Sequence, residues 1–173
     1  MSHLVAYVDG GSRGNPGLAG IGVVLEHGEG RRVEISESLA AQDNNYAEYA
    51  ALLLALEYAA ACGCARLQVF SDSEVVVRQI NGLYTCQSPA LRPIYEFCRA
   101  LIGSFEAFTL THIRREHNRE ANRLVQAALR RAPKGPARPL EAEDPAAVPP
   151  PPPDFPWRAA LARALQRAAL PQS

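Results

Sequence analysis

The first forty residues alternate apolar and polar positions with the two-residue period of β-strands. The strands that this pattern predicts cover residues 4–8, 19–26 and 31–39. The first is expected to end at Asp9, because the turn-forming residues of segment 9–17 interrupt the alternation and predict a tight loop. A turn at 27–30 separates the other two. The chain is therefore expected to open with three consecutive antiparallel strands.

After residue 43 the apolar residues recur with the spacing of α-helices. The clearest helix covers 44–61, with Asn44 or Asn45 as its N-cap and Gly63 just past its end. The later elements predicted are a strand at 66–71, helices at 72–81 and 90–102, a strand at 105–114 and a helix at 118–131. This order predicts an α/β fold, with a mixed five-stranded sheet flanked by helices. Because a helix joins the third strand to the fourth, the fourth strand is expected to run parallel to the first.

Proline divides the chain into three regions. Three of its 14 prolines precede residue 133, and eleven follow from Pro133 onward. A folded domain is therefore expected at 1–132, followed by a polyproline-biased linker at 133–154. The last region, 155–173, predicts a short amphipathic helix that docks on its own domain or on a partner. Its apolar stripe consists of Trp157, Leu161 and Leu165.

Composition and charge narrow the class of protein. The 173 residues are 47% apolar, which suits one core, and 18 basic residues balance 18 acidic ones. A net charge of zero gives no general attraction to membranes or nucleic acid, so a polyanion would need a local site. No stretch approaches the roughly 18 apolar residues of a membrane span, and the first twenty residues resemble no signal peptide. We expect a cytoplasmic monomer with no membrane partner, whose four cysteines are reduced thiols used in packing.

Three acidic residues are expected to meet at one edge of the sheet. Asp9 ends the first predicted strand and Asp72 follows the fourth, so their carboxylates emerge together if these strands are parallel neighbours. Glu48 lies on the inward-facing stripe of the helix at 44–61, and Asn122 has the same placement in the last helix. Each residue alone has an ordinary explanation, but their coincidence favours a site. Clustered carboxylates repel one another unless cations neutralise them, and oxygen ligands without Cys or His favour Mg²⁺ or Mn²⁺ over zinc.

Four segments, in order along the chain, resemble the motif blocks of type 1 ribonuclease H. They read Asp9-Gly-Gly-Ser-x-Gly-Asn-Pro-Gly17, Asn44-Asn45-x-Ala47-Glu48-Tyr49, Phe70-Ser71-Asp72-Ser73 and His117-Asn118-x-Glu120-Ala121-Asn122-x-Leu124. The resemblance covers roughly residues 3–131 and implies the ribonuclease H-like fold. It also implies an endonuclease that hydrolyses the RNA strand of RNA–DNA hybrids with two divalent cations, Mg²⁺ or Mn²⁺, and leaves 5′-phosphate and 3′-hydroxyl ends.

The resemblance assigns metal binding to Asp9, Glu48 and Asp72. Asn122 occupies the position of the family's fourth aspartate, so it is expected to be the fourth ligand through its amide oxygen. Because this amide is neutral, metal binding is expected to be weaker and the rate lower. A natural asparagine and an Asp→Asn substitution made to trap a complex read alike in a sequence. His117 resembles the family's loop histidine, which moves a proton or assists product release; an exposed loop imidazole with neither role is an equal alternative.

The resemblance also implies that amide side chains and backbone groups read the minor groove of the hybrid, where 2′-hydroxyls distinguish RNA from DNA. The residues that it assigns to this role are Gly14, Asn15, Asn44, Asn45 and Ser71. Asp43 departs from the family's pattern and is expected to repel a DNA phosphate, and segment 82–90 is too short for the basic handle that some members carry. Five arginines either compensate or form a solvated face: Arg78, Arg114, Arg115, Arg119 and Arg123.

Two functional hypotheses follow. The first is a metal-dependent hybrid endonuclease. The second is a catalytically weak hybrid-binding or adaptor module, in which Asn122 disables cleavage and the proline-rich tail recruits a protein partner. We prefer the nuclease, because a site that no longer cleaves has less reason to keep three inward-facing carboxylates.

Overall fold

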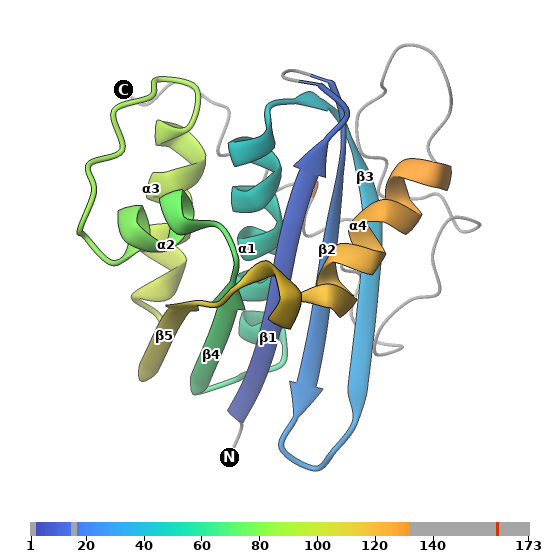
Figure 1. Ribbon diagram of the computed structural model, residues 1–173. Helices are drawn as coiled ribbons and strands as arrows, with labels where there is room; N and C mark the ends of the chain where they lie inside the picture. Colours follow the sequence, from blue (N-terminus) through green and yellow to red (C-terminus); the bar gives the residue numbers. More distant parts are fainter. Residues whose placement is uncertain (1–2, 15–16, 132–161, 163–173) are drawn as a thin grey trace.

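Five strands form one mixed sheet in the computed structural model of this chain, which describes residues 3–14, 17–131 and 162 (Figure 1). The strands are β1 (His3–Ser12), β2 (Gly17–His27), β3 (Arg32–Gln42), β4 (Arg66–Ser71) and β5 (Ala107–His112). They lie in the order β3-β2-β1-β4-β5. β2 is antiparallel to both of its neighbours, whereas β4 is parallel to β1 and to β5. The α/β fold expected from the sequence, with its parallel fourth strand, is confirmed.

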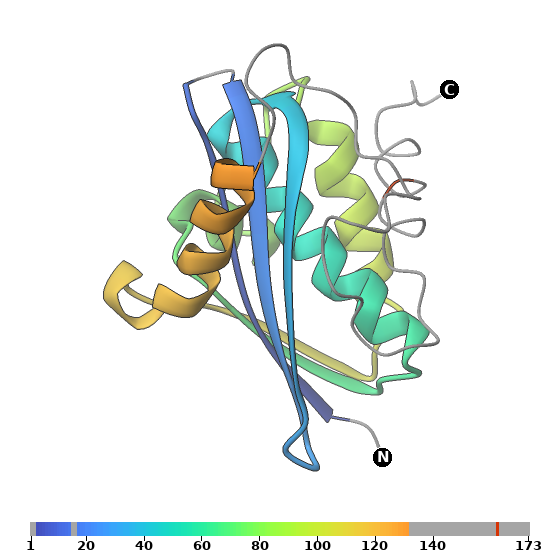
Figure 2. The same ribbon diagram turned by 90° about the vertical axis from the view of Figure 1, so that its right-hand side faces the viewer.

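Helices cover both faces of the sheet (Figure 2). They are α1 (Asn44–Ala61), α2 (Glu74–Ile80), α3 (Arg92–Ile102) and α4 (Arg119–Arg131), with a single 3₁₀ turn, η1 (Arg115–His117), in the described part of the chain. α1 and α3 lie on one face and α4 lies on the other. α1 is buried along most of its length, because it packs against both β1 and α3. None of the described helices is long and apolar enough to cross a membrane.

Two glycines let helices approach the sheet closely. A Cβ atom on Gly10 would lie 2.3 Å from the carbonyl carbon of Ala47 in α1, and one on Gly22 would lie 2.3 Å from the carbonyl oxygen of Ala121 in α4. Since Cβ atoms do not come that close to backbone atoms, only glycine permits either approach. Gly22 is also the β2 residue that faces Asp9 across the ladder. The two glycines therefore set the height of α1 above one face and of α4 above the other.

The expectation that the first strand ends at Asp9 is wrong. β1 continues to Ser12, because Gly10 and Gly11 keep pairing with β2, and Asp9 lies inside the strand opposite Gly22. Glycine is typical of turns, which is why the pattern predicted a loop. Gly10 instead lies inside β1, where the absence of a side chain lets α1 pack closely against the strand.

The N-cap of α1 is Asp43, not Asn44 or Asn45 as the sequence suggested. A carboxylate oxygen of Asp43 accepts a hydrogen bond of 2.7 Å from the backbone N–H of Tyr46. Its negative charge lies at the positive end of the helix dipole, which makes Asp a good cap. Gly63 follows the helix with a φ of +69°, as expected of a residue just past a helix end.

Four later elements are shorter than expected, although α3 and α4 differ only at their starts, Arg92 and Arg119. The helix predicted from 72 begins at Glu74, because the hydroxyl of Ser73 caps it by accepting from the N–H of Val76. The strand predicted at 105–114 covers Ala107–His112, and η1 follows it. The four cysteines are free thiols, and three of them are buried as expected: Cys64, Cys86 and Cys98. Cys62 is exposed just past the end of α1, so the expectation that all four are used in packing is wrong for this residue.

The predictions for the tail concern residues that the structure does not describe, apart from Ala162. They are the linker at 133–154 and the amphipathic helix at 155–173 with Trp157, Leu161 and Leu165. Asn15 also lies outside the described residues. α4 ends at Arg131, and the domain boundary at 132 stays a prediction.

Candidate metal centre

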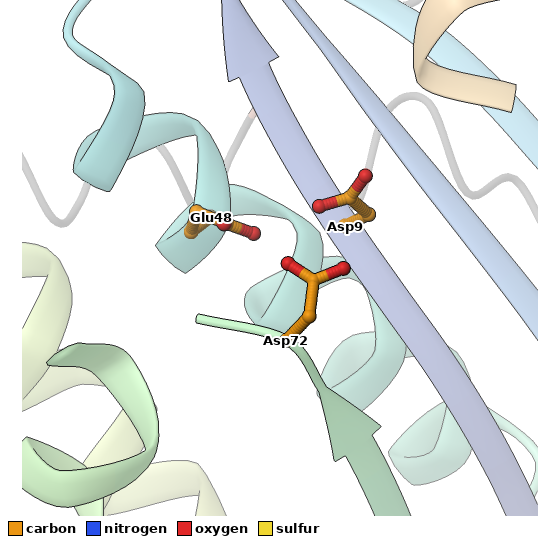
Figure 3. Close-up of side chains that lie close together, drawn as sticks. All are labelled: Asp9, Glu48 and Asp72. Atoms are coloured by element: carbon orange, nitrogen blue, oxygen red, sulfur yellow. The ribbon is translucent and has the colours of Figure 1, made fainter. Parts of the chain in front are cut away.

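Three carboxylates from three different elements converge where β1 and β4 stop pairing (Figure 3). Asp9 lies in β1, Asp72 directly follows β4, and Glu48 lies in the second turn of α1. One oxygen of each lies within 4.8 Å of those of the other two. The last partners in the parallel ladder are Val8 and Ser71, so the next residue of each chain emerges at the same edge of the sheet. The structure therefore brings together the three acids that the sequence singled out.

Glu48 is held toward β1 by a backbone contact. The N–H of Gly10 donates to Oε1 of Glu48 at 2.9 Å, and the missing Cβ of Gly10 lets α1 lie close enough for this bond. The Asp43 cap defines where α1 begins, and so which face of the helix carries Glu48. Glu48 is 6% exposed and Asp9 is 1% exposed. Two of the three acids are therefore buried, and charging them requires a compensating interaction.

The electrostatics of the site favour a cation. Burial raises the pKa of Asp9 to about 6. The hydrogen bond from Asn122 opposes this rise, the charge of Asp72 adds to it, and the charge of Arg115 opposes it. Burial also raises the pKa of Glu48 well above its ordinary value, and repulsion from the other two acids adds to that. Among the described residues no ion pair balances the three carboxylates, and Oδ1 of Asp9 is buried without a hydrogen-bond partner.

Asn122 reaches the site from α4, as the sequence predicted, but it faces Asp9 with its amide nitrogen. Nδ2 of Asn122 donates to Oδ2 of Asp9 at 3.0 Å, so the amide acts as a hydrogen-bond donor. A metal ligand would have to be its oxygen, which rotation of the amide about its last side-chain bond brings to the same place. The assignment of Asn122 as a ligand stays a prediction.

Asn118 is a residue of the site that the sequence reasoning missed. It is 1% exposed, and its Nδ2 donates to the backbone oxygen of Val8 at 2.9 Å and to Oδ2 of Asp72 at 3.0 Å. The available signal was its spacing from Asn122, because side chains four residues apart at a helix start share one face. Asn118 belongs to the fourth motif block and to the start of the last predicted helix, but the sequence pattern assigns it no role in the site.

The residues expected to read the hybrid differ in exposure. Asn44 is exposed at the start of α1, where its Oδ1 accepts from the N–H of Ser12 at 3.3 Å. Asn45 is half-buried. Gly14 is exposed and has a φ of +106°, which glycine adopts without strain. Asn44 and Gly14 therefore lie on the solvent side of the β1 end, and their contacts with a hybrid stay predictions.

Two other positions discussed for hybrid binding have local structural partners. Ser71 is 2% exposed, and its hydroxyl accepts from the N–H of Ser73 at 3.0 Å. Ser71 therefore shapes the turn that carries Asp72, and its contact with a hybrid is untested. The carboxylate of Asp43 is engaged in capping α1 through Tyr46. Asp43 is predicted to repel a DNA phosphate, and its carboxylate would do so from a position that the cap fixes.

The basic residues are only partly available to a polyanion. Ion pairs with neighbouring glutamates engage Arg78, Arg114 and Arg123. The field of Arg115 reaches Asp9, and Arg119 is exposed at the start of α4. His117 is exposed in η1 and lines a surface hollow of about 240 Å³ with Tyr7 and Val24 from the sheet. Its role in proton movement or product release stays a prediction.

Known proteins match most of this chain. A family model described as reverse transcriptase-like matches residues 7–128. "Ribonuclease HI" from Halobacterium salinarum is 40% identical over 125 residues, which cover 72% of this chain and 63% of that protein. The "Bifunctional protein Rv2228c" from Mycobacterium tuberculosis is 34% identical over 128 residues, which cover 73% of this chain and 35% of that protein. The chain thus spans 63% and 35% of the lengths of these two curated relatives.

Two crystal structures resemble the fold closely. RNase H1 from Halobacterium salinarum NRC-1 has a TM-score of 0.71 and 39% identity, over 75% of this chain and 99% of the other. LC11-RNase H1, solved in complex with an RNA/DNA hybrid, has a TM-score of 0.68 and 36% identity, over 73% of this chain and 96% of the other. At these identities the likeness extends beyond the fold to the sequence.

Proposed function

This chain belongs to the ribonuclease H family, and on that basis we propose that it hydrolyses the RNA strand of RNA–DNA hybrids in a metal-dependent reaction. The cluster of Asp9, Glu48 and Asp72 carries the proposal, because its oxygens lie close enough together to share divalent cations. The complex of LC11-RNase H1 with an RNA/DNA hybrid supports the choice of substrate.

The residues present fit a pair of Mg²⁺ or Mn²⁺ ions. All the candidate ligands are oxygens, and Oδ1 of Asp9 lacks any hydrogen-bond partner among the described residues. Cations bound there would activate the attacking water and stabilise the oxygen that leaves the phosphorus. The chain itself holds Asp9, Glu48 and Asp72 together against their mutual repulsion. It does so through the N–H of Gly10 and through two amides at the start of α4.

Recognition of the hybrid would use the exposed end of β1 and the start of α1. Asn44 lies there with its amide tied to the N–H of Ser12, and the exposed Gly14 offers backbone groups nearby in the chain. Amides both donate and accept hydrogen bonds, which suits 2′-hydroxyls and base edges in a shallow minor groove. With a net charge of zero, affinity depends on this local surface and not on general attraction.

The deciding experiment is a cleavage assay on an end-labelled RNA–DNA hybrid with Mg²⁺, with Mn²⁺ and with a chelator. We expect cleavage of the RNA strand in either metal and none in the chelator. Double-stranded RNA and double-stranded DNA of the same sequence serve as substrate controls. Hybrid binding without cleavage in both metals would instead support the adaptor alternative.

Asn122→Asp is expected to raise the rate in Mg²⁺ and to lower the half-saturating Mg²⁺ concentration about tenfold. A tenfold change corresponds to about 1.4 kcal/mol, a fraction of the roughly 4 kcal/mol between unit charges 4 Å apart near a protein surface. The measurement is a Mg²⁺ titration of the initial cleavage rate. Gln126→Glu, which adds the same charge at an exposed position one turn further along α4, is the matched control. If Asn122→Asp leaves both quantities unchanged, position 122 is not a ligand.

Ending the chain after residue 132 is expected to leave the cleavage rate within about twofold, because every proposed ligand precedes that point. The same truncated protein reports what the tail does. A lower melting temperature would mean that the segment at 155–173 docks on the domain. An unchanged melting temperature would mean that the apolar stripe of this segment docks on a partner. A truncated protein that folds normally but does not cleave would show that the tail contributes to substrate binding.

A further inference from the structure

Asn118 joins the two parts of the site that come from the sheet. Its Nδ2 has two hydrogens, and both are used: one bond goes to the backbone oxygen of Val8 and the other to Oδ2 of Asp72. Val8 is the last β1 residue with a partner in β4, and it directly precedes Asp9. A single amide nitrogen therefore ties the Asp72 carboxylate to the β1 backbone beside Asp9.

The backbone of Asn118 is fixed on both sides. Its N–H donates to the carbonyl of Arg115 at 2.9 Å, and its carbonyl accepts from the N–H of Asn122 at 3.1 Å. The side chain is 1% exposed, so it has no freedom to move toward solvent. Asn118 thus holds a rigid donor against Asp72 while Asn122, one helical turn later, donates to Asp9.

The orientation of the Asn118 amide is set by what it faces. Rotated by half a turn, its oxygen would point at the backbone oxygen of Val8 and at the Asp72 carboxylate, and three oxygens would repel. In the observed orientation Oδ1 is buried without a hydrogen-bond partner among the described residues. An unpaired buried acceptor is unfavourable for stability. The two hydrogen bonds that Nδ2 donates, to Val8 and to Asp72, offset the cost of leaving Oδ1 unpaired.

On the basis of the nuclease function proposed above, we propose that Asn118 is a positioning residue that orients Asp72 for metal binding by anchoring its carboxylate to the β1 backbone at Val8. The unoccupied lone pairs of Asp72 are then directed by a neutral donor, which adds no positive charge that would compete with a cation. Hydrogen-bonded partners of ligating carboxylates typically change metal affinity or activity by about 10- to 100-fold when removed.

Asn118→Ala is expected to raise the dissociation constant for Mn²⁺ about 10- to 100-fold, measured by calorimetric titration of the full-length protein with MnCl₂ and no nucleic acid. In the cleavage assay the half-saturating metal concentration should rise by a similar factor. KM for the hybrid at saturating metal should stay within about twofold of the wild-type value, because a residue that is 1% exposed offers almost no surface to a substrate. A rise in KM with unchanged Mn²⁺ affinity would overturn the proposal.

Asn81→Ala is the matched control. Nδ2 of Asn81 donates to the backbone oxygen of Leu110 at 3.0 Å, so this variant also loses an amide-to-backbone bond, but one between the C-cap of α2 and β5. Both variants should lower the melting temperature, while only Asn118→Ala should lose Mn²⁺ affinity. Equal loss of melting temperature in the two variants, with Mn²⁺ affinity retained in both, would reduce Asn118 to a structural role and overturn the proposal.

Asn118→Ser guards against a folding failure of the alanine variant. Serine is small and keeps one donor, so its Mn²⁺ dissociation constant should lie between those of the wild type and Asn118→Ala. Wild-type affinity in a folded Asn118→Ser variant would also overturn the proposal. The calorimetry separates this question from the nuclease function: if the wild type binds Mn²⁺ but cleaves no hybrid, the proposed function fails while the role of Asn118 is still decided by the Mn²⁺ constants.

Discussion

Asp9→Asn is expected to reduce hybrid cleavage by at least about a thousandfold while leaving the fold intact. Asp9 is the central acid of the cluster, and loss of its charge removes roughly 4 kcal/mol of attraction, which corresponds to about three orders of magnitude in rate. The substituted amide has the same shape and can still accept the hydrogen bond from Asn122 through its oxygen. The measurement is the initial cleavage rate in saturating Mn²⁺, with Glu106→Gln, an exposed acid, as the control for loss of one charge.

The same substitution is expected to stabilise the metal-free protein at pH 7. The pKa of Asp9 is raised from 3.8 to about 6 in the folded state, mainly by burial, so between these values the folded state holds more protons than the unfolded state. The free energy of unfolding of the wild type therefore falls as pH rises through that window, by up to about 3 kcal/mol. In Asp9→Asn, residue 9 does not titrate, so it contributes no such fall in the free energy of unfolding.

Melting temperatures in a chelator at pH 3.5 and pH 7 test this second effect. The gap between the variant and the wild type should open as pH rises and should be small at the acidic end. Added Mg²⁺ should then stabilise the wild type more than the variant. A variant that is less stable than the wild type at pH 7 without metal would contradict the view that Asp9 is strained by its surroundings. Retained cleavage would contradict the metal site itself.

Gly10→Ala is expected to damage both stability and activity. Its Cβ would lie 2.3 Å from the backbone of Ala47 and 2.6 Å from the nitrogen of Glu48, so α1 has to move away from β1. Overpacking of this kind typically destabilises by about 1–3 kcal/mol. The shift also lengthens the bond from the Gly10 N–H that holds Glu48, so we expect the cleavage rate to fall at least about tenfold even where the protein is fully folded.

Gly11→Ala provides the comparison for that experiment. A Cβ on Gly11 would meet its nearest atoms at 3.5 Å from Val125 and 3.7 Å from Asn44, which is ordinary contact. We expect this variant to lie within about 0.5 kcal/mol of the wild type in denaturant unfolding and to cleave normally. If Gly10→Ala and Gly11→Ala behave alike, the close approach of α1 does not position Glu48.

Much of this architecture can be predicted from the sequence, because regular elements leave a periodic signal. The helix at 44–61 and the strand at 66–71 have the bounds that their patterns predict. The convergence of Asp9, Glu48 and Asp72 also follows once the fourth strand is taken as parallel to the first. Periodicity suffices for these features because it reports which face of each element is buried.

Contacts between elements leave no such signal. Gly10 looks like a turn residue until α1 is seen packed against it, and Asn118 looks like a helix start until its amide is seen between Val8 and Asp72. The N-cap of α1 lies one or two residues before the predicted positions for a related reason, since Asp43 and the two asparagines after it are all good caps. Which of them caps the helix depends on where β3 ends, and the pairing of β3 within the sheet determines that end.

The parallel pairing of β1 with β4 also bears on when the site comes into being. β1 meets β2 through a short loop, but it meets β4 only after about sixty further residues have been placed. Closing so long a stretch of chain is slower and entropically harder than closing a hairpin. We therefore expect Asp9 and Asp72 to stay apart for much of folding, so that the ligand set is assembled late. A divalent ion that binds the assembled site is then expected to slow unfolding and not to speed folding.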